Sequence, residues 1–429
     1  MNRDLSIIVL GRVLQVLIAL VAIRILTTFL SPEEVGNYYI ILALLAFFNL
    51  VLLNPPSMYF GRHLLQWQRS KNLLNALFVF VLWIIIVAIV AIPVSMSVYY
   101  WLEYEAKFDL DLFLIYIFIA IIISTIHRNV MYGANTLGYR KEFVIYLIST
   151  LFIGLICSVS IVYFYYNFAL GWLMGVVLSE TLMLFLIFKF FIQKNRLNIK
   201  KIKITLNKDK IKKILAFSLP IGLTTFLMWG QNTAYRFLVD YQYSAEVLGY
   251  IGVGLGIATA IFASIEGISM QYFNPIFLKD ILDANKEQRT NAWNKIAKQI
   301  VPIYILAVFF TIAMSEVLIN ILVDKKFHDA YVYIMFGVGI EFFRVMTNLL
   351  NNVSQSEYKT TETIKPYAVG FIVSLGMLSI SDFGTNYFMI PLVLSIAYLL
   401  VFIYMYINMR RLLKIKYKFS MYKTIFMSL

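Results

Sequence analysis

Several arginines stand inside apolar stretches of this sequence, where a permanent positive charge is expensive to bury. They are Arg12, Arg24, Arg128, Arg236 and Arg344. Placing an arginine at the centre of a bilayer costs about 2.5–3.5 kcal/mol on insertion scales, so its repeated use indicates a function. The guanidinium group is planar, always charged and able to hold two phosphate oxygens at once. If these side chains face a common water-filled space, they predict a cationic cavity suited to a phosphate group.

These arginines also have structural interpretations that the sequence leaves open. Arg24 and Arg236 lie close to one end of their predicted spans, and each could extend its charged end to the lipid headgroups. Arg12 could do the same toward the opposite side. Arg128 lies near the predicted cytoplasmic boundary of its span, where an arginine needs no further explanation.

Three carboxylates, Glu180, Glu266 and Glu341, lie inside apolar stretches as well. Buried acids in transporters can carry a coupling proton or bind sodium, and all three are candidates for ion coupling. The alternative is an ion pair with an arginine. That alternative is strongest for Glu341, because it precedes Arg344 by one helical turn and would share a helix face with it.

The elements that must position these residues are long apolar segments. The chain of 429 residues is 61% hydrophobic and only 14% charged, whereas a soluble domain has about 25% charged residues. Each segment is long enough to cross a bilayer as a helix. The predicted spans are 5–30, 34–62, 73–98, 111–132, 143–165, 169–192, 215–239, 246–274, 297–320, 329–352, 365–382 and 386–408. We therefore predict an all-α polytopic membrane protein with about twelve transmembrane helices.

Lysine and arginine are distributed unevenly between the two sides of the predicted membrane. Of the 37, 30 fall at the two termini and in or near alternate loops, Arg128 among them, and only Lys107, Lys325 and Lys326 fall in the opposite loops. The remaining four are Arg12, Arg24, Arg236 and Arg344. This bias predicts that the rich side, with both termini, is cytoplasmic. The opposite side carries acids instead, namely Glu33, Glu34, Glu103, Glu105, Asp109, Asp111, Asp240, Glu246 and Asp324.

The two halves of the chain repeat one another. The segment AIRILTTFLSPEEVGNY at 22–38 matches AYRFLVDYQYSAEVLGY at 234–250, and RNVM at 128–131 corresponds to RVM at 344–346. The offset of six spans is even, so both halves cross the membrane in the same direction, and in such transporters the substrate site lies between them. We predict two six-helix bundles around a central cavity. They comprise 1–193 and 214–429, joined by a basic cytoplasmic linker at 194–213, and the second ends in a basic cytoplasmic tail.

Recognisable catalytic and metal-binding motifs are absent from the sequence. His63, His127 and His328 are scattered and do not have the spacing of metal ligands. There is no Walker motif and no G-x-S-x-G nucleophile motif. We predict no metal, no catalytic residues and no cofactor, with coupling to a proton or sodium gradient left open.

Residues 30–38, LSPEEVGNY, together with Asn54-Pro55 and YFGR at 59–62, resemble the oligosaccharide flippases of bacterial surface-polysaccharide synthesis. The resemblance implies the multidrug/oligosaccharidyl-lipid/polysaccharide exporter (MOP) fold, a V-shaped pair of six-helix bundles that alternates between inward-open and outward-open states. It implies a polyprenyl-pyrophosphate-linked oligosaccharide as substrate, such as an O-antigen unit for lipopolysaccharide, carried across the bacterial inner membrane. It also implies membrane lipids and the polymerase and chain-length proteins of the same pathway as partners, and no nucleic acid.

Two other functions remain open at this stage. A multidrug exporter of the same superfamily usually carries cations and should line its cavity with acids, whereas arginines outnumber acids inside these spans. A membrane polysaccharide polymerase or ligase would bind the same lipid-linked sugars. Such enzymes typically carry a large outer loop, and the longest predicted loop here is cytoplasmic. Flippase is therefore the preferred prediction.

Overall fold

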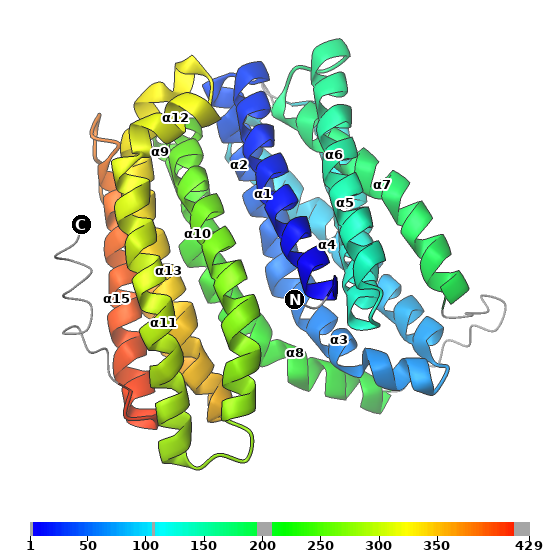
Figure 1. The fold of residues 1–429 in the computed structure, drawn as a ribbon. Helices are drawn as coiled ribbons and strands as arrows, with labels where there is room; N and C mark the ends of the chain where they lie inside the picture. The colour runs from blue at the N-terminus through cyan, green and yellow to red at the C-terminus, as the bar shows by residue number, and fades with distance from the viewer. Residues whose placement is uncertain (1–2, 105–107, 195–207, 416–429) are drawn as a thin grey trace. The chain divides into compact units, whose positions relative to one another are not determined.

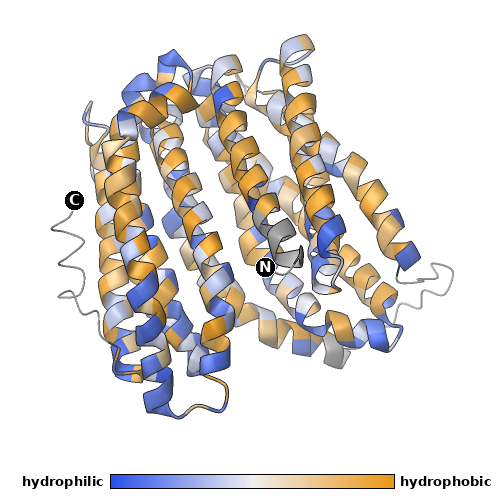
Figure 2. Ribbon diagram, viewed as in Figure 1, coloured by the Kyte–Doolittle hydropathy of each residue, from blue (hydrophilic) through white to orange (hydrophobic). Residues whose placement is uncertain are grey.

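The computed structural model describes residues 3–104, 108–194 and 208–415. All the regular elements in these ranges are helices. Twelve helical segments among them are long and apolar enough to cross a membrane, which confirms the predicted fold class. Hydrophobic residues run along the helices, while hydrophilic residues gather at helix ends and turns (Figure 2).

The chain divides into two compact units, the first comprising Met1–Trp229 and Val239–Gly249. In this unit α6 packs against α1 and α7, α5 packs against α4 and α7, and α8 packs against α3 (Figure 1). The unit contains α1 (Arg3–Phe29), α2 (Pro32–Phe47), η1 (Phe48–Leu53), α3 (Asn54–Arg69), α4 (Leu73–Trp101), α5 (Leu110–Thr136), α6 (Arg140–Phe164), α7 (Ala169–Lys194), α8 (Lys208–Trp229) and parts of α9 (Tyr235–Gln242) and α10 (Ala245–Asp280).

The second unit comprises Gly230–Leu238 and Tyr250–Leu429. In it α13 packs against α11 and α15, and α14 packs against α15 and η4. Besides the remaining parts of α9 and α10, the unit contains η4 (Gly230–Ala234), α11 (Lys286–Ala313), α12 (Ser315–Leu322), η5 (Lys325–Ala330), α13 (Tyr331–Ser356), η6 (Thr360–Thr363), α14 (Ile364–Ile380) and α15 (Met389–Leu412).

The second span contains a π-helical segment, η1, immediately before two prolines. Pro55 and Pro56 have no backbone N–H, so the carbonyls one turn earlier lose their usual helical donors. The indole of Trp83 donates to one of them, the Leu52 carbonyl, at 3.0 Å. The wider turn also brings Asn49 onto the side of the span that faces α5. Such π-helical turns occur often at functional sites.

The ninth span was predicted at 297–320, and this placement is wrong by about three turns at its start. α11 begins at Lys286 and is capped by Asn285. The Asn285 side chain accepts from the Gln288 backbone N–H at 2.9 Å, and the Gln288 side chain accepts from the Asn285 backbone N–H at 2.8 Å. The helix ends at Ala313, and α12 follows as a separate short helix. Hydropathy locates only the apolar part of a helix, so it missed the polar turns at the start of α11.

The predicted extents of the two bundles stay predictions. Most of the linker at 194–213 and most of the basic tail lie outside the described residues. By its contacts, α8 belongs to the first unit, although its sequence begins the second repeat. The seventh span therefore changes unit at Gly230, where η4 begins.

Candidate functional site

In the first unit, Arg128 on α5 lies beside the π-helical turn of the second span. Its Nη2 donates to the Oδ1 of Asn49 at 3.0 Å, and the hydroxyl of Thr125, one turn earlier on α5, approaches the same oxygen at 3.4 Å. The Asn49 amide nitrogen in turn donates to the Leu45 carbonyl at 3.0 Å, which fixes the orientation of the amide. The Arg128 side chain remains exposed. Its partner is thus a neutral amide.

The carboxylate whose charge acts on this arginine belongs to Glu180 on α7. It accepts a hydrogen bond from Ser124 on α5, four residues before Arg128. Glu180 and Arg128 interact electrostatically. Within the described part of the chain they form no ion pair, so Arg128 keeps most of its hydrogen-bonding capacity.

In the second unit, Arg344 on α13 is held between two carboxylates. Its Nε donates to Glu341 at 2.6 Å and its Nη1 donates to Glu266 on α10 at 2.9 Å. The exposed fractions of the three side chains are only 22%, 6% and 16% in the order Arg344, Glu341, Glu266. The ion pair with Glu341, left open by the sequence, is confirmed.

The other oxygens of these carboxylates are also satisfied. The hydroxyl of Thr259 donates to Glu341 at 2.8 Å, and the amide of Asn348 donates to Glu266 at 2.8 Å. All four carboxylate oxygens therefore accept a hydrogen bond, as buried charges require. Arg344 is here part of a compact buried ion-pair network, and its charge is compensated.

The other three predicted arginines lie in different surroundings. Arg12 is exposed on α1 and donates to Gln15 at 2.9 Å. Arg24 lies about 18 Å further along the same helix, at 1.5 Å per residue, and is half-buried. Arg236, in the second unit, lies with its Cζ 5.9 Å from the ring centroid of its neighbour Tyr235. Each within its own unit, Arg128 bonds Asn49, and Arg344 bonds Glu266 and Glu341.

The sequence prediction missed two polar partners of these arginines. Asn49 is the one polar residue in the apolar run ILALLAFFNLVLL, a signal that could have been used. Asn348 lies four residues after Arg344 on α13, also about one helical turn away, as Glu341 is at three residues before it. The approach of Glu266 to Arg344 joins residues far apart in sequence, and no local pattern predicts it.

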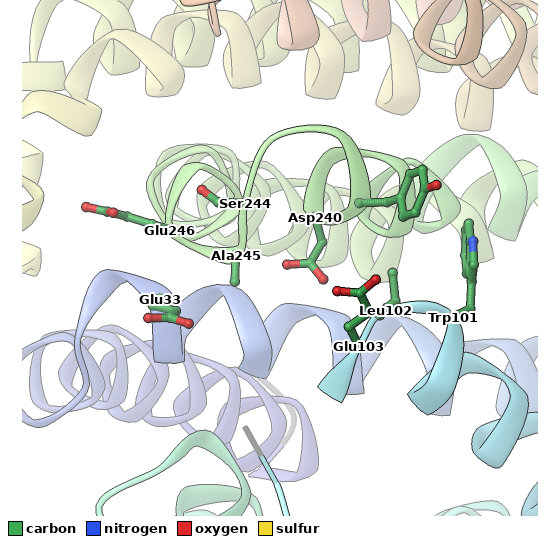
Figure 3. Close-up of a pocket in the computed structure, with 9 residues that line it drawn as sticks. Glu33, Trp101, Leu102, Glu103, Asp240, Ser244, Ala245 and Glu246 are labelled. Carbon is green, nitrogen blue, oxygen red and sulfur yellow. The ribbon is translucent and has the colours of Figure 1, made fainter. Parts of the chain in front are cut away.

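Four acids of the first unit surround a pocket of about 380 Å³ (Figure 3). They are Glu33, Glu103, Asp240 and Glu246. Trp101 and Tyr241, which also line it, stack with their ring centroids 5.5 Å apart. The sequence placed these acids on the side opposite the lysines, and the structure gathers them around one space. Among the described residues, those that line the pocket include four acids and no lysine or arginine.

A buried tyrosine supports the wall of this acidic pocket. The hydroxyl of Tyr104 donates to Asp240 at 3.3 Å, and the ring is fully buried. Burial, followed by the negative charge of Asp240, raises the pKa of Tyr104 well above its usual value. The hydroxyl therefore stays protonated and remains a hydrogen-bond donor.

The turns at Ser31 and Ser244, which lie in the two matching segments of the internal repeat, have the same local geometry. The Ser31 hydroxyl accepts from the Glu34 N–H at 3.2 Å, and the Ser244 hydroxyl accepts from the Val247 N–H at 3.2 Å. Each serine thereby caps the start of the following helix, α2 or α10. The matched geometry supports the internal repeat.

Comparison with known proteins supports this architecture. The family described as "Polysaccharide biosynthesis protein" matches residues 25–332. No curated protein sequence matches the chain. Among solved structures, the lipid II flippase MurJ in an inward closed conformation has a TM-score of 0.70 at 13% identity, covering 96% of this chain and 88% of its own.

Two transporters of the MOP superfamily are similar in fold as well. An inward-facing multidrug resistance MATE family transporter has a TM-score of 0.65 at 13% identity and covers 93% of this chain and 95% of its own. A transporter from Pyrococcus furiosus, described as having a binding pocket of reverse polarity, has a TM-score of 0.55 at 14% identity, with 95% of each chain covered. At these identities the likeness establishes the fold alone. The chain has the fold of the MOP superfamily and belongs to the family of polysaccharide biosynthesis proteins.

Proposed function

We propose that this protein is a flippase for a polyprenyl-pyrophosphate-linked oligosaccharide, carrying it from the cytoplasmic to the periplasmic leaflet of the bacterial inner membrane. The observation that carries the proposal is the family match over residues 25–332 in a chain with a transporter fold. The family supplies the connection to polysaccharide synthesis and the fold supplies transport. The arginines inside the spans supply groups suited to a pyrophosphate. The cargo is an O-antigen-type repeat unit of a surface polysaccharide.

The proposed mechanism is alternating access. Arginine side chains bind the pyrophosphate in a cationic cavity, and the protein alternates between a state that exposes the cavity to one leaflet and a state that exposes it to the other. The polyprenyl tail stays in the apolar phase, because its transfer to water would be unfavourable. Both termini are cytoplasmic in this arrangement. Glu180, Glu266 and Glu341 are the candidates for coupling transport to protons or sodium.

The experiment that tests the function is an analysis of lipid extracts from cells that lack the protein. A flippase predicts accumulation of a complete, unpolymerised repeat unit on its polyprenyl carrier, facing the cytoplasm. The sugars of that unit would identify the cargo, and its leaflet would identify the blocked step. A complete unit that had reached the outer face would instead indicate a polymerase or ligase. Unchanged lipids with intact surface polysaccharide, in cells without a second flippase, would contradict the proposal.

A second candidate, a multidrug exporter, is favoured by the similarity of fold to MATE family transporters. Cationic drugs require acids in the binding cavity, whereas Arg128 is exposed and Glu180, the acid that acts on its charge, is bonded to Ser124. We therefore expect overexpression to leave resistance to cationic dyes unchanged. Resistance that rises with expression, and that Glu180→Gln abolishes, would favour the exporter.

The proposed partners follow from the proposed cargo. Polymerase and chain-length proteins of the same pathway would receive the repeat unit on the periplasmic side. Cross-linking in intact cells, with mass spectrometry of the adducts, tests for them. Finding only unrelated membrane proteins would remove these partners and leave the flippase proposal standing.

A further inference from the structure

The two repeats use an equivalent arginine in opposite electrostatic settings. Arg128 on α5 and Arg344 on α13 occupy matched positions, and each donates to a side chain of the span that follows the serine-capped turn. In the first unit that side chain is the amide of Asn49, and in the second it is the carboxylate of Glu266. The arginine is thus present in both repeats, but its partner is a neutral amide in the first and a carboxylate in the second.

The difference decides how much charge each arginine can offer to a ligand. Glu266 and Glu341 together more than balance the charge of Arg344, and both lie within ion-pair distance. A phosphate group would have to displace these carboxylates and would meet their repulsion. Near Arg128, the carboxylate of Glu180 accepts a hydrogen bond from Ser124 and forms no ion pair with the guanidinium in the described structure. An anion therefore meets a cation there with no salt bridge to break.

Geometry also favours Arg128. A guanidinium carries five N–H donors, and Arg128 uses one nitrogen toward Asn49 while its side chain is exposed. The donors left over can hold two oxygens of a phosphate side by side. The position is eight residues from the end of the span at Thr136, about 12 Å at 1.5 Å per residue. The guanidinium therefore lies within the helical segment and not at its end, and a polar environment or a ligand would favour a charge there.

We propose that the pyrophosphate of the cargo binds in the first unit at Arg128, held in place by Asn49, and that Arg344 is a structural ion-pair residue. The inference rests on the proposed flippase function and assigns its anion site. It separates two of the five arginine candidates, Arg128 and Arg344, which occupy matched positions in the repeats. It also assigns a role to Asn49, which lets the arginine be fixed without being neutralised.

The test compares binding of a short-chain polyprenyl diphosphate to the purified full chain in nanodiscs of zwitterionic lipid. Inorganic pyrophosphate and phosphatidylglycerol serve as competitors. The informative variant is Asn49→Asp, which gives Arg128 the kind of partner that Arg344 has. Asn49→Ala removes the amide without adding charge. The matched variant in the second unit is the triple substitution Glu266→Gln, Glu341→Gln and Arg344→Met, which removes the whole ion-pair network.

We expect Asn49→Asp to weaken diphosphate binding at least tenfold, with a melting temperature equal to or above that of the unaltered chain. The maintained melting temperature would separate cancellation of charge from misfolding. The triple variant should bind within about threefold of the unaltered chain. Asn49→Ala removes the hydrogen bond that positions Arg128 but leaves its charge uncompensated, so it should weaken binding by less than Asn49→Asp does. Inorganic pyrophosphate should compete, and phosphatidylglycerol should compete far more weakly.

Three results would overturn the assignment. The first is tight binding by Asn49→Asp. The second is loss of binding in a folded triple variant with Asn49→Asp unaffected. The third is equal competition by phosphatidylglycerol, which would indicate a general headgroup contact. Failure of the flippase proposal is recognised separately, because cells lacking the protein would then accumulate no lipid-linked unit. Accumulation in those cells without diphosphate binding by the purified chain would overturn the site at Arg128 alone.

Discussion

Gly36 on α2 and Gly249 on α10, each five residues after its capping serine, lie at one close helix crossing within the first unit. A Cβ built on Gly249 would lie 2.0 Å from the Pro32 carbonyl oxygen and 3.2 Å from the Gly36 nitrogen. A Cβ on Gly36 would lie 1.8 Å from the Ala245 carbonyl oxygen. Pro32 and Ala245 each follow a capping serine, so each glycine packs against the equivalent carbonyl of the other helix. The first turn of α10 is thereby held against α2.

Gly249→Ala should destabilise this crossing, because a methyl group meets a backbone carbonyl that cannot turn aside. We expect a loss of about 1–3 kcal/mol, the usual range for overpacking. Thermal unfolding of the purified chain measures it. The matched control is Gly267→Ala on the same helix, where a Cβ meets nothing within 4 Å. It should leave stability unchanged or raise it, by up to about 1 kcal/mol. Equal effects at both positions would show that the close contact carries no strain.

Arg344→Gln should destabilise the chain strongly, because it leaves two buried carboxylates without a cation. The expected loss is about 3–5 kcal/mol, as for other broken buried pairs. A matched control in the same unit is Lys295→Gln, which breaks the pair with Asp280 at 2.9 Å. The Lys295 side chain is 59% exposed, so the expected loss is about 0–1 kcal/mol. Denaturant unfolding in one detergent compares the two, and similar losses would contradict the network described for Arg344.

Tyr104 should make the chain less stable at alkaline pH. Its pKa is raised in the folded state, whereas an unfolded tyrosine ionises near pH 10. Above that pH the unfolded chain releases a proton that the folded chain retains, so stability falls as pH rises, and below it the contribution is fully present. Tyr104→Phe should flatten the fall in melting temperature above about pH 10. Tyr100→Phe, at an exposed ring nearby, is the control. An unchanged slope in Tyr104→Phe would show that another group governs the alkaline transition.

The sequence was most informative about features that are local or periodic. Twelve spans, the capped turn after Ser31 and its counterpart at Ser244, and the pairing of Glu341 with Arg344 were all accessible from hydropathy, repeat and helical spacing. These features depend on neighbours within one or two turns. A single sequence records such relationships directly.

Other features depend on tertiary contacts that no pattern in one sequence specifies. The approach of Glu266 to Arg344 joins two helices, and the gathering of Glu103 and Asp240 around one pocket joins the end of α4 to the end of α9. The π-helical turn that brings Asn49 to Arg128 depends on two prolines and on a donor from another span. Sequence reasoning therefore treated the two arginines as equivalent, and the structure separates them by their partners.

The central claim is that the chain moves a lipid-linked pyrophosphate by means of Arg128, and leaflet accessibility of the cargo tests it most directly. Cells lacking the chromosomal copy would express the unaltered chain, Arg128→Lys or Arg128→Gln at equal level. The lipid-linked repeat unit at the outer face would then be measured with a reagent that does not cross the membrane. We predict that the unaltered chain restores exposure, that lysine restores part of it because the charge remains, and that glutamine restores less than a tenth. Full exposure with Arg128→Gln would contradict the account.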